Sequence, residues 1–130
     1  MKLIDVYQNI KEKYPDAVVF IKSGKFYLTF DNDASICNLL CGYKIVNNKL
    51  GFPEGVCEKV KKIFEDKQID FFIDDNIFSF EGNNYYLWLK KVSDDLIVNN
   101  MVKTLNGVIK TKLENNFNNY DRIRKFLNEL

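Results

Sequence analysis

Residues 14–31, YPDAVVFIKSGKFYLTFD, carry the clearest indication of the fold. Its apolar run AVVFIK, at 17–22, is rich in branched side chains and is typical of a strand covered on both faces. Ser23 and Gly24 then predict a turn, and FYLTF, at 26–30, is interpreted as the returning strand. The sequence therefore predicts a β-hairpin near the start of the chain.

Helices and further strands are expected on both sides of this hairpin. The spacing of apolar residues predicts a helix over 3–13 that ends before Pro15. Capping residues and Pro53 predict two more helices, over 33–41 and about 54–67. Further extended segments are expected at 43–46, 49–52, 69–74, 77–81 and 85–92, with the last two forming a hairpin.

This order of elements predicts an α/β fold, with a mixed β-sheet of about five to six strands flanked by helices. The length of 130 residues corresponds to about one domain. Residues 1–92 are expected to form the α/β core. Residues 93–130 contain two apolar stripes at helical spacing, which predict a C-terminal helical extension packed on the same domain.

Charge limits the functions that the chain can perform alone. It carries 19 Lys+Arg and 18 Asp+Glu, a formal net charge of +1. A compact domain that grips duplex DNA by itself usually has a strong basic surplus. Only two cations are arginine, Arg122 and Arg124, which disfavours bidentate reading of bases. Any nucleic-acid contact is therefore expected to be local, weak or supported by a partner.

The absence of histidine excludes Ser-His-Asp and Cys-His catalysis and histidine-ligated zinc. The three thiols, Cys37, Cys41 and Cys57, lack a fourth ligand for zinc, so we expect core fillers and no metal or cofactor. Met1-Lys2 leads straight into an amphipathic stretch, and no apolar run approaches the ~18 residues of a membrane helix. The expected location is the cytoplasm, with reduced thiols and no membrane partner.

Residues 14–31 resemble the opening of the N-terminal mismatch-recognition domain of the DNA mismatch repair family MutS. That family has Gly-Asp-Phe-Tyr-Glu-Leu-Phe where this chain has GKFYLTF, at 24–30, and both continue into an Asp-Ala helix. GFP, at 51–53, resembles the family's Gly-Val-Pro before its second helix. The resemblance covers about 1–75 clearly and 76–92 loosely, and implies a MutS domain I-like fold.

The resemblance also implies a candidate DNA site. In MutS the Phe of this motif wedges into the minor groove against a mispaired base, and the Glu two residues later hydrogen-bonds that base. The Phe corresponds to Phe26, the Glu to Leu28, and the Asp before the Phe to Lys25. The candidate DNA-binding residues are Phe26, Lys25, Lys22, Ser23, Gly24 and Leu28. The implied partners are kinked or mismatched double-stranded DNA and another protein that supplies the missing MutS functions.

Two other classes of function stay open. No G-x-x-x-x-G-K-[ST] motif is present, so a P-loop ATPase is excluded and we expect no enzymatic activity. One rival is a protein-interaction module that kept the fold and lost DNA binding, as the near-neutral charge and Leu28 favour. The other is a metal-dependent nuclease, a hypothesis supported only by the carboxylates of Asp74, Asp75 and Glu65.

Two features also have purely structural interpretations. Phe26 could be an aromatic residue packed in the core at a strand end. The expected hairpin over 77–92 would place Phe78 and Phe80 on one face and Tyr86 and Trp88 on a face of the partner strand. Such a face could stack single-stranded bases, or it could receive the C-terminal helix.

Overall fold

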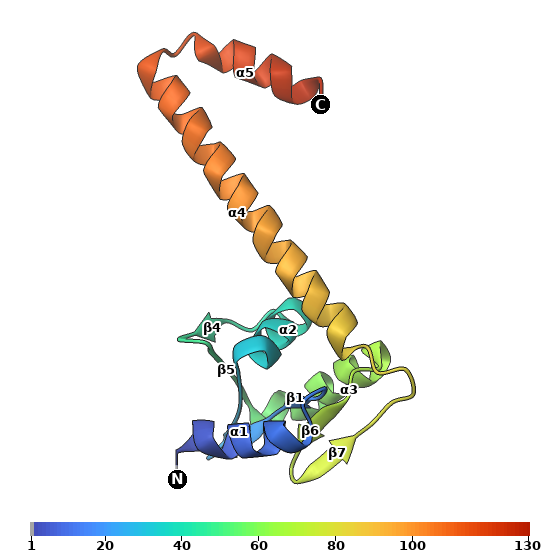
Figure 1. Ribbon diagram of the computed structural model, residues 1–130. Coiled ribbons are helices and arrows are strands. Elements are labelled where there is room, and N and C mark those ends of the chain that lie inside the picture. Colours follow the sequence, from blue (N-terminus) through green and yellow to red (C-terminus); the bar gives the residue numbers. More distant parts are fainter. Residues whose placement is uncertain (1) are drawn as a thin grey trace. The chain divides into compact units, whose positions relative to one another are not determined.

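The computed structural model describes residues 2–130, which divide into two compact units. Unit 1 extends to Val92, and unit 2 comprises Ser93–Leu130. Unit 1 is a mixed α/β structure with two small sheets, and unit 2 is helical (Figure 1). The α/β class and the helical C-terminal segment are therefore confirmed.

The strands lie in two sheets instead of the expected single sheet. One contains four antiparallel strands in the order β2-β3-β5-β4, and the other has the order β1-β6-β7. β1 is parallel to β6, and β6 is antiparallel to β7. The strands are β1 (Val18–Val19), β2 (Ile21–Ser23), β3 (Phe26–Phe30), β4 (Ile45–Val46), β5 (Lys49–Pro53), β6 (Phe71–Ile73) and β7 (Asn76–Phe78).

The apolar run at 17–22 explains the two sheets, because it serves both. Its first half, β1, pairs with β6, and the Phe20 N–H donates to the Phe72 carbonyl at 2.9 Å. Its second half, β2, leaves β6 and pairs with β3. The run is buried throughout except at Lys22, as expected for a strand covered on both faces.

The helices of unit 1 contribute one face each to the core. They are α1 (Leu3–Lys13), α2 (Asp31–Cys41), the 3₁₀ turn η1 (Glu54–Val56) and α3 (Cys57–Lys67). The largest fully buried side chains are Phe20, Phe52, Phe64, Phe71, Ile36, Leu50, Ile69 and Ile73. These residues come from strands of both sheets, their connecting segments, α2 and α3, and they form one apolar core. The α1 helix packs on a second cluster, in which Tyr7 contacts Val19, Ile21 and Phe72.

The expected strand over 85–92 is wrong, because these residues begin the helix α4 (Tyr85–Asn115). Tyr85 and Val92 are buried, and Trp88 and Leu89 pack against the same core. This spacing of three, four and seven residues is helical. The Asn83 side-chain oxygen accepts the backbone N–H of Tyr85 at 3.1 Å at the start of the helix. β7 therefore pairs only with β6 among the described strands.

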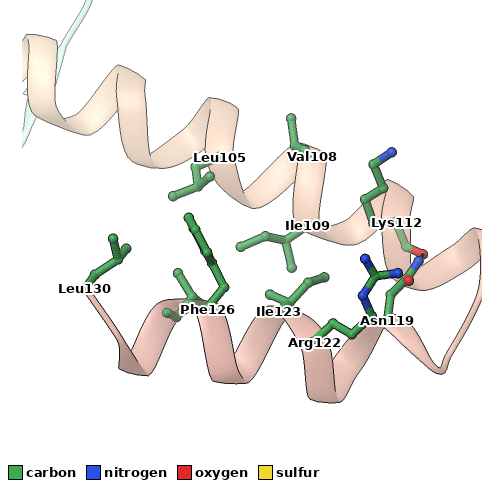
Figure 2. Close-up of a pocket in the computed structure, with 10 residues that line it drawn as sticks. Leu105, Val108, Ile109, Lys112, Asn119, Arg122, Ile123, Phe126 and Leu130 are labelled. Carbon is green, nitrogen blue, oxygen red and sulfur yellow. Dashed lines mark hydrogen bonds between the residues drawn. The ribbon is translucent and has the colours of Figure 1, made fainter.

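Unit 2 contains the remainder of α4 and the helix α5 (Asn119–Asn128). A groove of about 590 Å³ separates the two helices, with Leu105, Phe126 and Ile109 toward one end and Lys112 and Arg122 toward the other (Figure 2). All of Ser93–Leu130 is described, and none of it is buried. No helix within residues 2–130 is long and apolar enough to cross a membrane. Packing of this segment on the α/β core stays a prediction.

Candidate nucleic-acid interface

The candidate site lies on the β2–β3 hairpin. Ser23 and Phe26 are paired across the turn, and Gly24 has a φ of +60°. A positive φ at the first of two central residues is the requirement of a type II′ turn, which glycine meets without strain. The carbonyl of Lys25 accepts the backbone N–H of Glu54 at 2.8 Å, which fastens the turn to the end of β5.

Phe26 projects from the face of β3 that points away from the main core. Its side chain is 52% exposed, whereas Tyr27 is 4% exposed. Successive residues of a strand point to opposite faces, so Phe26 and Leu28 share one face and Tyr27 takes the other. Pro53 is the neighbour of Phe26 on β5. Phe26 is therefore available for contact, and the structural alternative of a core aromatic is wrong.

Leu28 lies further along the same face and packs over Gly51 of β5. These residues are paired, and a Cβ placed on Gly51 would lie 2.9 Å from Leu28 Cδ2. Any side chain at Gly51 would displace Leu28. Glycine at this position lets Leu28 fold over the sheet and leaves Phe26 as the exposed apolar group at the hairpin end.

Lys22 lies on the opposite face from Phe26, because its strand neighbour is Tyr27. Its ammonium group lies 2.7 Å from Glu54 Oε2 and 5.2 Å from the centre of the Tyr27 ring. The hydrogen bond to Glu54 raises the pKa of Lys22. Lys25 is exposed and has no ion-pair partner within residues 2–130. Lys25, and not Lys22, is thus the free cation beside Phe26.

Tyr27 anchors the hairpin to unit 1. Its hydroxyl donates to Asp74, with distances of 2.7 Å and 2.9 Å to the two carboxylate oxygens. Burial is the main reason that the pKa of Tyr27 is raised, and the hydrogen bond to Asp74 adds to it. The Tyr27 ring also stacks on Phe52 at 5.7 Å. The exposed face of β3 is therefore carried by a strand whose other face is fixed in the core.

The structure brings together part of the predicted set. Ser23, Gly24, Lys25 and Phe26 form the turn and its immediate flank, and Leu28 follows on the same face as Phe26. Lys22 is separated from them by the sheet. Sequence reasoning missed Glu54, whose carboxylate lies next to Lys22, and considered Asp74, which lies next to Tyr27, only as a nuclease carboxylate. Their positions depend on contacts across 32 and 47 residues, which no local pattern signals.

Residues 1–64 match the family model of MutS domain I. The N-terminal part of the chain is therefore similar to MutS domain I. The matched segment includes the β2–β3 hairpin and every candidate DNA-binding residue, and ends in α3. It does not include β6, β7 or the C-terminal helices. No curated protein matches the chain.

The other candidate surface of unit 1 is not formed. The aromatic face expected over 77–92 required a hairpin, and Tyr86 and Trp88 belong to α4 instead. Phe78 and Phe80 are partly buried against Phe71, with ring centroids 4.7 Å and 6.2 Å away. These rings fill the core side of the three-stranded sheet. The hypothesis of a base-stacking face there is wrong.

The cysteines differ in their environments. Cys37 and Cys57 are buried, and Cys41, one turn after Cys37 on α2, is half-buried, contrary to the expectation that all three are buried. The Cys37 thiol hydrogen-bonds to Cys41, which lowers the pKa of Cys41 and raises that of Cys37. Across the described part of the chain, no three Cys, Asp or Glu side chains gather as metal ligands. Cys41 is therefore the thiol best suited to react.

Proposed function

We propose that unit 1 is a non-enzymatic DNA-binding domain of the mismatch-recognition type, which inserts Phe26 into the minor groove of a kinked or mismatched duplex. The observation that carries the proposal is the half-exposed Phe26 ring at the end of a hairpin fixed by Tyr27. Inserting an apolar side chain between base pairs costs a few kcal/mol of unstacking and is offset by contacts that the bent duplex permits. A rigid hairpin reduces the ordering cost of insertion.

Leu28 sets the selectivity that we propose. It stands where the resemblance to MutS places the base-contacting Glu, and a leucine side chain neither donates nor accepts a hydrogen bond. The domain would therefore respond to how easily a duplex kinks, because mispaired sites unstack more easily than paired ones. We propose a small preference for mismatched over matched duplexes, which Leu28→Glu should increase.

Lys25 is proposed to contact the phosphate backbone next to Phe26. Lys22 contributes less, because its ammonium group is engaged by Glu54 at 2.7 Å. With one free cation at the turn and a net charge of +1 on the chain, the affinity of this domain alone would be low. We therefore propose a cytoplasmic partner protein that supplies the other functions of MutS.

Fluorescence anisotropy with matched and mismatched duplexes at low salt tests the proposal. Phe26→Ala should weaken binding by about 5- to 150-fold, the scale of one lost aromatic stack. Val46→Ala is the matched control, because Val46 is a similarly exposed apolar strand residue (54%) outside the hairpin. If the unaltered chain binds no duplex at high micromolar concentration, or both variants bind equally, the proposal is wrong.

The cations provide a second, independent test. Lys25→Ala should weaken matched and mismatched duplexes alike and reduce the slope of log K against log salt by about one unit. Lys22→Ala should have a smaller effect. Glu54→Gln should strengthen binding, because it removes a carboxylate and frees Lys22. Equal losses for the two lysine variants would contradict the role given to Glu54.

A protein-interaction module is the second candidate, and the Lys22–Glu54 ion pair favours it. An ion pair at the hairpin reduces the positive charge that DNA would meet, and Phe26 is equally suited to a pocket on another protein. The same binding assay separates the two. Absence of duplex binding, with a stable and folded chain, would leave the interaction module as the better account.

A further inference from the structure

The α4 helix carries an apolar stripe within unit 2 that nothing in unit 2 buries. The stripe consists of Ile97, Val98, Met101, Val102, Leu105 and Val108, each at least half exposed. Spacings of three and four residues place these side chains on one side of the helix. Lys103 and Lys110 lie on the opposite side, and Asn100 flanks the stripe. We call the six apolar residues the α4 stripe.

The α5 helix covers only one end of this side of α4. Ile109 and Ile123 face each other between the helices and are partly shielded (Figure 2). Phe126 remains 63% exposed and Leu130 88% exposed at the groove. A helical pair without buried residues has little to stabilise it, because most helix stability in proteins comes from packing an apolar face. A contiguous apolar surface of this kind is typical of an interface.

Charges at the two ends of the α4 stripe indicate what covers it. Asp94 and Asp95 precede the stripe, and Lys112 follows it. Asp94 and Lys112 are 18 residues apart, which is five turns, so they lie on the same side of α4 and about 27 Å apart. Arg122 of α5 lies at the same end of the groove as Lys112 (Figure 2). One end is thus acidic and the other basic.

We propose that the α4 stripe is a dimer interface, occupied by the α4 stripe of a second copy in antiparallel orientation. This arrangement places Asp94 of each copy opposite Lys112 of the other, and it pairs the first half of one stripe with the second half of the other. A parallel arrangement would oppose Asp94 to Asp94 and Lys112 to Lys112. Such a two-fold contact is self-complementary and closed.

The exposed area is sufficient for a stable dimer. The stripe, with Phe126 and Leu130, exposes roughly 700 Å² of apolar surface per copy, counting each half-exposed side chain as about 80–100 Å². A standard specific interface buries about 800 Å² per partner. This inference does not depend on DNA binding by unit 1, so either proposal can fail without the other.

Sedimentation equilibrium of the full chain tests the proposal. The unaltered chain should dimerise at micromolar concentration, and Met101→Glu should weaken the dimer by about 30-fold or more, as for a central interface residue. Lys103→Glu is the matched control, because it places the same acidic side chain on the opposite side of α4. Circular dichroism of Met101→Glu should show the helical content of the parent. A chain that stays monomeric at high micromolar concentration would overturn the proposal.

A charge exchange tests the antiparallel orientation. Asp94→Lys and Lys112→Glu should each weaken self-association, because each brings like charges together at both ends of the interface. Mixing the two variants should restore association. In the mixed dimer the two substituted side chains, one basic and one acidic, face each other at one end, and the unaltered Lys112 and Asp94 face each other at the other. Two variants that each dimerise as well as the parent, or a mixture that does not recover, would contradict the antiparallel arrangement.

Discussion

Lys11 Nζ lies 2.9 Å from Asp33 Oδ1, and this ion pair ties α1 to α2 across the first strands of unit 1. Asp33 is fully buried and accepts hydrogen bonds from the hydroxyls of Tyr7 and Tyr85, both at 2.7 Å, and from the Val19 N–H at 3.1 Å. Four donors therefore satisfy one carboxylate. Two helices, the first strand and the first turn of α4 meet at this single side chain.

Asp33→Asn should destabilise unit 1 by about 3 kcal/mol, because removing one partner of a buried ion pair leaves the other charge uncompensated. The amide also presents donors to groups that are themselves donors. Urea denaturation followed by circular dichroism measures the change. Asp31→Asn, an exposed residue in the first turn of the same helix, is the control and should change the free energy of unfolding by less than about 0.5 kcal/mol.

Phe26→Ala should change the melting temperature little, because the side chain is half exposed and lies outside the main core. Phe52→Ala, at the partner of Tyr27 on the buried face of β5, should cost about 3–5 kcal/mol through loss of apolar burial and the cavity left behind. Thermal denaturation of both variants measures the difference. If Phe26→Ala destabilises the fold as much as Phe52→Ala, the ring supports the core and the DNA proposal loses its basis.

Unit 1 should lose stability as the pH rises above about 10. Burial and hydrogen bonds to Asp33 and Asp74 raise the pKa values of Tyr7, Tyr85 and Tyr27 above the unfolded value of about 10. Above that pH the unfolded chain releases these protons while the folded chain keeps them, so the free energy of unfolding falls by up to about 1.4 kcal/mol per pH unit for each group. Tyr27→Phe should reduce this slope by one group between pH 10 and 11, as urea titrations at both pH values would show.

Cys41 should react with thiol reagents before Cys37 and Cys57. The hydrogen bond from Cys37, together with the positive charge of Lys59, lowers the pKa of Cys41, whereas burial raises that of Cys57. The thiolate is the reactive form, so reaction at neutral pH should start at Cys41. Cys37→Ala should slow this reaction by removing the donor, and Cys57→Ala should not. Rates measured by absorbance, with peptide mapping of the first product, decide between the sites.

The local elements of unit 1 followed from the sequence because their determinants are local. The apolar run at 17–22, the turn at Ser23 and Gly24 and the capping residues act over a few positions. The spacing within 26–30 likewise places Phe26 and Leu28 on one face whatever the rest of the chain does. The segment 85–92 was wrongly predicted to be a strand, because an apolar segment of eight residues fits both a strand and a buried helix. The helical form is stabilised because it packs both Tyr85 and Val92 against the core.

The α/β class and the β2–β3 hairpin could be predicted from the residues alone, since they depend on period, turn chemistry and near neighbours, whereas the exposure of Phe26 became clear only from the packing of unit 1. The distribution of charge around that hairpin likewise depends on the tertiary structure. Glu54, which follows β5, reaches Lys22 because β3 pairs with both β2 and β5, and Asp74, which follows β6, accepts the Tyr27 hydroxyl from the other sheet. Ion pairs and buried hydrogen bonds act between atoms a few ångströms apart, and which residues meet at that distance depends on strand order and register.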